Sequence, residues 1–137
     1  MLHHVKYLGI DYGTKRIGLA LSDEEGKVAF PAGVIASGSA ALAKVSTIAT
    51  EKKVAAIVMG ESRDFRDKPN PLMEDIRKFK KELAELTGLP VEYEQEFMTS
   101  VQAARQGKDK RGEGTEARSL DASAAALILQ SYLDRKR

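Results

Sequence analysis

Short apolar runs separated by polar turns occupy the first third of the chain. Residues 5–11 (VKYLGID) and 15–22 (KRIGLALS) each have the length and apolar content of a strand. The intervening turn, 11–14, contains Gly13, and hairpin turns often need a positive φ angle. A second polar turn (DEEG) leads to a third strand near 28–35. This pattern predicts three antiparallel strands in a meander.

Beyond residue 38 the apolar spacing becomes that of helices alternating with strands. Helices are predicted over 39–53, 70–87, 99–106 and 116–135, and strands over 54–60 (VAAIVMG) and 90–95. The run VAAIVMG is apolar throughout, which is typical of a strand covered on both faces in a parallel sheet. The helix that follows Asn70 places its large apolar residues on one face: Leu72, Ile76, Phe79, Leu83 and Leu86.

The predicted elements follow the order βββαβαβαα, which indicates an α/β fold. Three antiparallel strands followed by alternating strands and helices favour a five-stranded mixed sheet with helices on both faces. At 137 residues, the chain has the length of one domain, and we expect residues 1–137 to form it.

Three acidic residues lie where solvated acids are unusual. Asp11 ends the first apolar strand, Glu96 ends the fifth strand just before a helix, and Asp121 lies in an apolar helix. If the first and fifth strands run parallel, their carboxyl ends share one edge of the sheet, where α/β proteins bind ligands. Three oxygen ligands suit Mg²⁺ or Mn²⁺, and two such ions can support phosphodiester hydrolysis.

Asp121 shares its helix face with Ala125, Ile128 and Tyr132, which is the pattern of a core-facing stripe. A bare carboxylate there would be costly, so Asp121 must pair with a cation, accept strong hydrogen bonds or lie at a cleft.

Each acid also has a simpler structural explanation when it is considered alone. Asp11 could form a turn through its side chain, and Glu96 and Asp121 could be acids favoured near a helix N-terminus. The three positions together favour a site.

Composition removes several kinds of chemistry. The chain has no cysteine, which excludes disulfides, thiolate nucleophiles and Cys-ligated metals, and agrees with a reducing cytoplasm. Its two histidines lie at positions 3 and 4, which leaves little material for a catalytic triad or a zinc site. No apolar run reaches the ~18 residues of a membrane helix, and the N-terminus lacks a signal-peptide pattern, so we expect no membrane partner.

The formal net charge is only +2, but its distribution is uneven. Residues 99–137 contain eight Lys and Arg against five Asp and Glu. The candidate nucleic-acid contacts in this segment are Arg105, Lys108, Lys110, Arg111 and Arg118. On charge alone, a solvated loop with a solubilising tail is the simpler explanation.

Four segments resemble the YqgF/RuvX family of Holliday junction resolvases and pre-16S rRNA nucleases. LGIDYGTKRIGLALSD resembles the first motif of the family, and VAAIVMG resembles its fourth-strand motif. LPVEYEQEFMTSVQA resembles the segment of the central acid, usually D-E-R-L-T-T/S, and LDASAAALILQSYLD resembles the final helix. The resemblance covers most of the chain and implies an RNase H-like nuclease.

Carried over residue by residue, the resemblance implies that Asp11, Glu96 and Asp121 are the catalytic carboxylates and the metal ligands. It also implies that Lys15 and Arg16 contact phosphates of structured RNA or branched DNA.

Two departures from the family pattern concern the neighbourhood of the site. Gln95 and Phe97 replace the Asp and Arg that usually flank Glu96. Losing this Arg removes a bidentate phosphate contact, which would alter substrate positioning or weaken activity. Residues 61–69 also diverge from the family, as either a substrate loop or a variable surface loop.

Two other functions fit parts of the same sequence. A non-catalytic nucleic-acid-binding RNase H-like module would explain the altered neighbours of Glu96. The first motif also resembles the phosphate loop of actin-like and sugar-kinase ATP-binding modules, although a two-domain ATP cleft needs a longer chain. The sequence does not separate DNA from RNA as the substrate, and it leaves a homodimer, which symmetric junction cleavage would need, as an open expectation.

Overall fold

The computed structural model describes residues 5–61, 71–95 and 115–136, and the strands within these ranges form a single five-stranded sheet. The strands are β1 (Tyr7–Tyr12), β2 (Arg16–Ser22), β3 (Ala29–Ala36), β4 (Ala56–Glu61) and β5 (Val91–Gln95). Across the sheet they follow the order β3-β2-β1-β4-β5. The first three strands pair antiparallel, whereas β4 pairs parallel with both β1 and β5. The predicted mixed sheet is confirmed.

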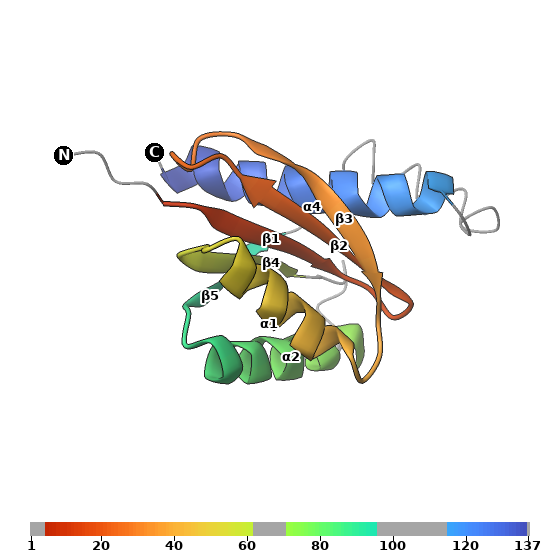
Figure 1. Cartoon of the computed structure of the whole chain (residues 1–137). Coiled ribbons are helices and arrows are strands. Elements are labelled where there is room, and N and C mark those ends of the chain that lie inside the picture. Colours follow the sequence, from red (N-terminus) through yellow and green to blue (C-terminus); the bar gives the residue numbers. More distant parts are fainter. Residues whose placement is uncertain (1–4, 62–70, 96–114, 137) are drawn as a thin grey trace.

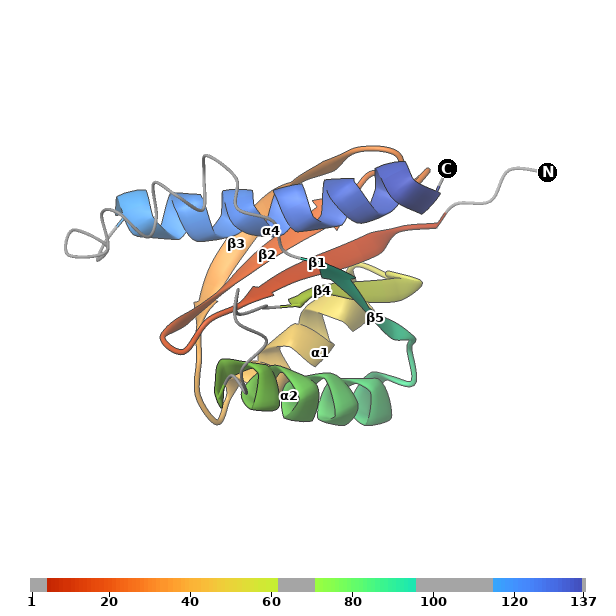
Figure 2. The ribbon, with the colours of Figure 1, turned by 180° about the vertical axis from the view of Figure 1, so that it is seen from behind.

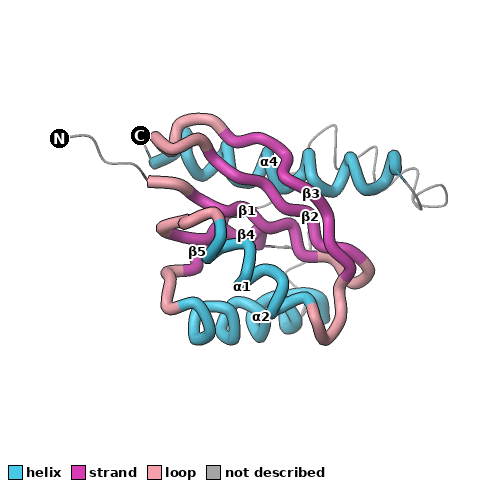
Figure 3. Tube along the Cα trace, viewed as in Figure 1, coloured by secondary structure: helices cyan, strands magenta, loops and turns pink. Residues whose placement is uncertain are grey.

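Helices cover both faces of this sheet, as the sequence predicts. The helices α1 (Ala41–Glu51) and α2 (Pro71–Thr87) lie on one face, and α4 (Thr115–Lys136) crosses the other (Figures 1 and 2). Figure 3 shows the strands as a middle layer between these two helical layers. None of the helices in the described ranges is long and apolar enough to cross a membrane.

Alternation along β1 divides the core into two parts. Leu8 and Ile10 are fully buried in the cluster that includes residues of α1 and α2, whereas Tyr7 packs in the cluster beneath α4. Successive side chains of a strand point to opposite faces. Asp11 has the parity of Tyr7, so the strand directs it to the α4 face.

Two glycines allow α4 to lie directly on the sheet. A Cβ atom built at Gly9 would lie 2.8 Å from the Cβ of Leu129. At Gly18 it would lie 2.1 Å from the carbonyl oxygen of Asp121. Side chains at these positions would push the helix outward, so both glycines set how closely α4 approaches β1 and β2.

The apolar stripe predicted for α2 needs one correction. Ile76, Phe79 and Leu83 are buried as expected, but Leu86 is 56% exposed. Leu86 lies in the last turn of the helix. The next leucine after Leu83 that packs against the core is Leu89, which lies beyond the helix end. The helical spacing therefore holds until the helix leaves the core.

Two segments predicted from the sequence cannot be compared with the structure. The helix over 99–106 and most of the divergent segment 61–69 lie outside the described residues.

Candidate active site

Asp11 lies inside the sheet rather than in the turn predicted at 11–14. The strand β1 continues to Tyr12, and Asp11 pairs in register with Gly18 of β2. Directly paired residues of antiparallel strands have Cα atoms about 4.5–5.5 Å apart and side chains on the same face. Asp11 is only 6% exposed. Its burial places a charged residue on the α4 face beside the position where Gly18 has no side chain.

Asp121 reaches the same place from α4. It is 5% exposed, and the three residues predicted to share its helix face are also buried, which confirms the core-facing stripe: Ala125, Ile128 and Tyr132. The backbone of Asp121 lies against Gly18, the register partner of Asp11. The fold therefore brings together two of the three predicted carboxylate residues, 110 positions apart in the sequence, at Gly18.

Of the three environments expected for Asp121, a cation, strong hydrogen bonds or a cleft, the structure shows a cation, Arg16. Its Nε donates a hydrogen bond to Oδ2 of Asp121 at 2.6 Å. The Arg16 side chain is 22% exposed and that of Asp121 is 8% exposed, so solvent screens this pair less than it screens a surface ion pair. The sequence resemblance assigns Arg16 to substrate phosphates, whereas the structure shows it bonded to a candidate catalytic carboxylate.

The other predicted contacts are only partly covered by the structure. Lys15 is exposed in the turn between β1 and β2, next to Arg16. Arg118 belongs to α4, but the structure does not describe its side chain. The remaining predicted site residues lie outside the described ranges: Glu96, Arg105, Lys108, Lys110 and Arg111.

The donor set at Asp11 and Asp121 fits a hard divalent cation. Carboxylate oxygens are the ligands that Mg²⁺ and Mn²⁺ prefer, and burial strengthens their attraction for a cation. Within the described residues, no group of three His, Cys, Asp or Glu side chains forms a metal cluster. A third protein ligand would therefore have to come from outside these ranges, where Glu96 lies.

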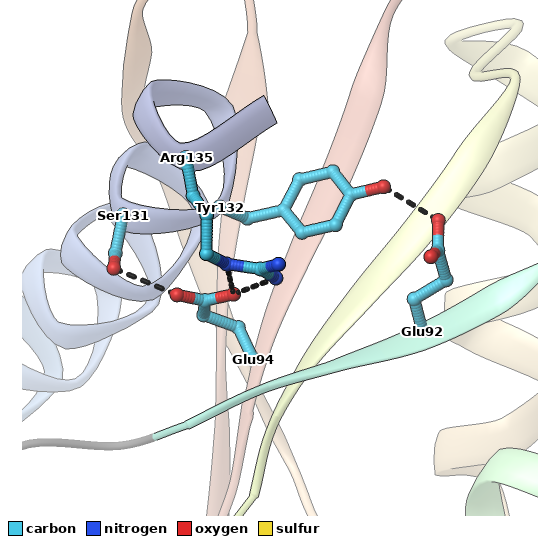
Figure 4. Close-up of polar contacts among 5 residues, drawn as sticks. All are labelled: Glu92, Glu94, Ser131, Tyr132 and Arg135. Atoms are coloured by element: carbon cyan, nitrogen blue, oxygen red, sulfur yellow. Dashed lines mark hydrogen bonds and ion pairs between the residues drawn. The ribbon is translucent and has the colours of Figure 1, made fainter. Parts of the chain in front are cut away.

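A second polar group joins β5 to α4, and the sequence analysis did not identify it. Glu94 of β5 is 4% exposed. Ser131 Oγ donates to one oxygen of its carboxylate at 2.7 Å, and Arg135 Nη2 donates to the other at 2.5 Å (Figure 4). The available signal was the repeat of acids at 92 and 94, which places both on one face of a strand.

Glu92 extends this contact between β5 and α4. Tyr132 donates its hydroxyl hydrogen bond to Glu92 at 2.5 Å (Figure 4). Burial raises the pKa of Tyr132 above its usual value, and the neighbouring Glu92 carboxylate raises it further. The pKa of Arg135 is raised by its hydrogen bond and charge interaction with Glu94. These contacts hold the edge strand β5 against the C-terminal half of α4.

This arrangement of sheet and helices defines the class of the protein as an RNase H-like fold. The chain resembles Thermus thermophilus RuvC with a TM-score of 0.61 and 17% identity, over 96% of each chain. It resembles a Fowlpox virus resolvase, solved with Holliday junction DNA, with a TM-score of 0.59 and 15% identity, over 96% of this chain and 99% of the viral one. At these identities the likeness establishes the fold.

Closer relatives establish the family. Residues 5–135 match the family model described as "RuvX: Holliday junction resolvase". The chain is 36% identical to an Oenococcus oeni protein named "Putative pre-16S rRNA nuclease", over 96% of both chains. A Nitratidesulfovibrio vulgaris protein with the same name is 37% identical, over 95% of this chain and 94% of the relative. The chain therefore belongs to the RuvX family.

Proposed function

We propose that this protein is a divalent-metal-dependent nuclease that hydrolyses phosphodiester bonds in structured nucleic acid. The observation that carries the proposal is that Asp11 pairs in register with Gly18, that the backbone of Asp121 lies against the same glycine, and that both acids are buried. Membership in the RuvX family and the names of its relatives support the reaction class.

The proposed metal ligands are Asp11, Asp121 and Glu96. Glu96 follows Glu94 by two residues, and its parity in the sequence is that of the two acids of β5 that contact α4. When bound, Mg²⁺ or Mn²⁺, as two ions, would supply the charge that activates a water molecule and stabilises the leaving oxygen.

Basic residues around these acids would hold the substrate backbone. Lys15 is exposed one residue before Arg16, which itself contacts Asp121. Lys15 can therefore contact a phosphate close to the proposed metal site. The basic segment 105–118 would add attraction that does not depend on sequence.

The substrate candidates are the 5′ segment of precursor 16S rRNA and the four-way DNA junction. The first follows from the names of the close relatives, and the second from the description of the family model. Both occur in the cytoplasm, where we place the protein. Junction resolution would also require a homodimer, since two opposed strands must be cut.

The test is cleavage of both substrates with Mg²⁺ or Mn²⁺. We expect wild-type protein to cleave at least one of them and a chelator to abolish cleavage. Asp11→Asn and Asp121→Asn should each lower the rate at least ~100-fold, because a carboxamide is a neutral and weaker ligand for a hard cation. Asp134→Asn, an exposed acid on the same helix, should keep the wild-type rate. Equal background cleavage by wild type and both site variants would contradict the proposal.

A second function is favoured by one feature of the sequence. Gln95 and Phe97 replace the acid and the arginine that usually flank the central glutamate of the family. If this change removed catalysis, the protein would be a binding module of the same fold. Salt-sensitive binding of RNA or junctions, without cleavage by the wild-type protein, would identify that function.

A further inference from the structure

Strand β2 contacts α4 at Asp121 in two different ways. Gly18 lies against the backbone of Asp121, and Arg16, two residues earlier on the same face of the strand, binds its carboxylate. We refer to Arg16 and Gly18 together as the Asp121 mount. The mount contains no carboxylate, yet it touches both the backbone and the reactive end of a proposed metal ligand.

The Gly18 contact fixes the position of the helix backbone. A Cβ at this residue would lie 2.1 Å from the carbonyl oxygen of Asp121, 2.5 Å from its carbonyl carbon and 3.1 Å from the backbone nitrogen of Ala122. All three atoms belong to the backbone of α4, so they cannot move aside as the end of a flexible side chain can. The first half of α4 therefore lies directly on β2 at the residue that matters for the proposed site.

The same glycine fixes the relation of the helix to β1. Gly18 is the register partner of Asp11, and the adjacent pairs on each side, Tyr12 with Ile17 and Ile10 with Leu19, continue the ladder. Because the ladder determines the distance between Asp11 and Gly18, the mount also determines how far Asp121 lies from Asp11.

The Arg16 contact fixes the carboxylate itself. The hydrogen bond of 2.6 Å from Arg16 Nε to Oδ2 restrains the orientation of the Asp121 carboxylate. The bond is charge-assisted because it joins a guanidinium to a carboxylate, and it is poorly screened because both side chains are mostly buried. An arginine that only contacted phosphates would have no need of this bond.

We propose that Arg16 and Gly18 are positioning residues that set the Asp121 carboxylate against Asp11 for metal binding. This inference rests on the proposed function and deepens it, since it moves Arg16 from the substrate to the metal site. Two competing roles make different predictions. If Arg16 only contacted a substrate phosphate, Arg16→Ala would change the affinity for substrate and leave metal affinity unchanged. If the Arg16 guanidinium only occupied the position of the metal, it would weaken metal binding in the wild type, and Arg16→Ala would bind metal more tightly.

The experiment compares Mn²⁺ binding, measured by calorimetry without nucleic acid, in wild type, Arg16→Ala and Lys15→Ala. Partners that orient metal ligands typically contribute about 10–100-fold to metal affinity. We expect Arg16→Ala to weaken Mn²⁺ binding by that factor, with Arg16→Lys in between because lysine keeps the charge but loses the planar geometry. Lys15→Ala, the matched change at the exposed neighbour, should leave Mn²⁺ affinity unchanged and raise the KM for nucleic acid.

A double variant tests whether Arg16 acts through Asp121. Adding Arg16→Ala to Asp121→Asn should cause no further loss of Mn²⁺ affinity, because the carboxylate that Arg16 orients is already gone. Thermal unfolding of each variant identifies those that remain folded. In the double variant both charges of the Arg16–Asp121 pair are removed, so neither is left buried without the other. Unchanged or tighter Mn²⁺ binding in folded Arg16→Ala, or additive losses in the double variant, would overturn the inference.

Amide hydrogen exchange separates a failure of this inference from a failure of the proposed function. If wild-type protein binds no Mn²⁺, the metal-dependent function fails. In that case, the amide exchange rates of residues 120–124 test whether the Asp121 mount positions this part of α4. Faster exchange in Arg16→Ala than in Lys15→Ala supports the mount, and equal rates overturn it.

Discussion

The site depends on the absence of a side chain at Gly18. Gly18→Ala would place a methyl group in contact with the backbone of Asp121. We expect the free energy of unfolding to fall by about 1–3 kcal/mol, as for other overpacked sites. We also expect Mn²⁺ affinity to fall, because the turn that carries Asp121 must move away from Asp11.

Gly9→Ala is the matched comparison for this variant. It would also crowd α4, but against Leu129 and the carbonyl oxygen of Ala125 rather than at Asp121. Denaturant unfolding should show a loss of stability in both variants, and calorimetry should show the larger loss of Mn²⁺ affinity in Gly18→Ala. Equal losses of affinity would mean that Gly18 acts only through overall stability.

At the scale of single residues, the sequence predicted that Asp121 has a cation, strong hydrogen bonds or a cleft beside it, but not which residue supplies them. Its apolar helix face made an unpaired carboxylate unfavourable, and the structure confirms both the burial and a cation. Arg16 lies 105 residues away, and one sequence contains no signal for a contact at that separation. The family resemblance instead favoured a substrate contact for Arg16.

At the scale of elements, the contact between β5 and α4 stabilises the edge of the sheet nearest to Glu96 in sequence. Ser131→Ala would remove one hydrogen bond from the buried Glu94 carboxylate. We expect a loss of about 1–2 kcal/mol in the free energy of unfolding, measured with urea.

Thr47→Ala on α1 is the control for Ser131→Ala. Both changes replace a hydroxyl residue by alanine within a helix, so the gain in helix propensity is similar. Thr47 is exposed, and its loss should change stability by less than about 0.5 kcal/mol. A similar small effect for Ser131→Ala would show that its bond to Glu94 contributes little.

The tyrosine of the same contact predicts a pH dependence. Burial, and then Glu92, raise the pKa of Tyr132 above its usual 10.0. The protonated form is therefore favoured in the folded state. This contribution is complete below pH 10 and is lost as the pH rises through the folded-state pKa. The free energy of unfolding should thus fall above pH 10.

Tyr132→Phe tests this assignment by denaturant unfolding at several alkaline pH values. The variant should lose less stability above pH 10 than the wild type does. The pKa of Tyr12 is also raised, by burial and by Asp75, and that of Lys136 is raised by its contact with Tyr7, so part of the slope should remain in Tyr132→Phe and become smaller when Tyr12→Phe is added. Identical slopes in wild type and Tyr132→Phe would exclude Tyr132 as the cause.

The pattern of apolar positions predicted the order and direction of the strands, but not the contacts between elements. VAAIVMG was identified as a strand covered on both faces, and β4 indeed lies between β1 and β5 with helices on both sides. Glu94 was not identified because alternation shows which face a strand residue occupies, not what packs there. Ser131 and Arg135 of α4 supply the partners, and they are 37 and 41 residues away.

At the scale of the whole molecule, the charge distribution predicts binding that depends on salt. Each phosphate neutralised by a basic residue releases counterions. A plot of the logarithm of the binding constant against the logarithm of the salt concentration therefore has a slope of about −0.9 per phosphate contact. Lys15→Ala should lower the magnitude of this slope by about one for duplex or junction DNA, measured by fluorescence anisotropy. Lys44→Ala, on the helical layer opposite α4, should leave the slope unchanged. Equal slopes in Lys15→Ala and wild type would remove Lys15 from the interface.

If the proposed function is correct, Asp11 and Asp121 share a bound divalent cation. The most direct measurement is the anomalous scattering of manganese in crystals grown with Mn²⁺. We expect a manganese peak in contact with both carboxylates, on the α4 face beside Gly18. Manganese bound elsewhere, or a structure with Mn²⁺ in solution and none between these two residues, would contradict it.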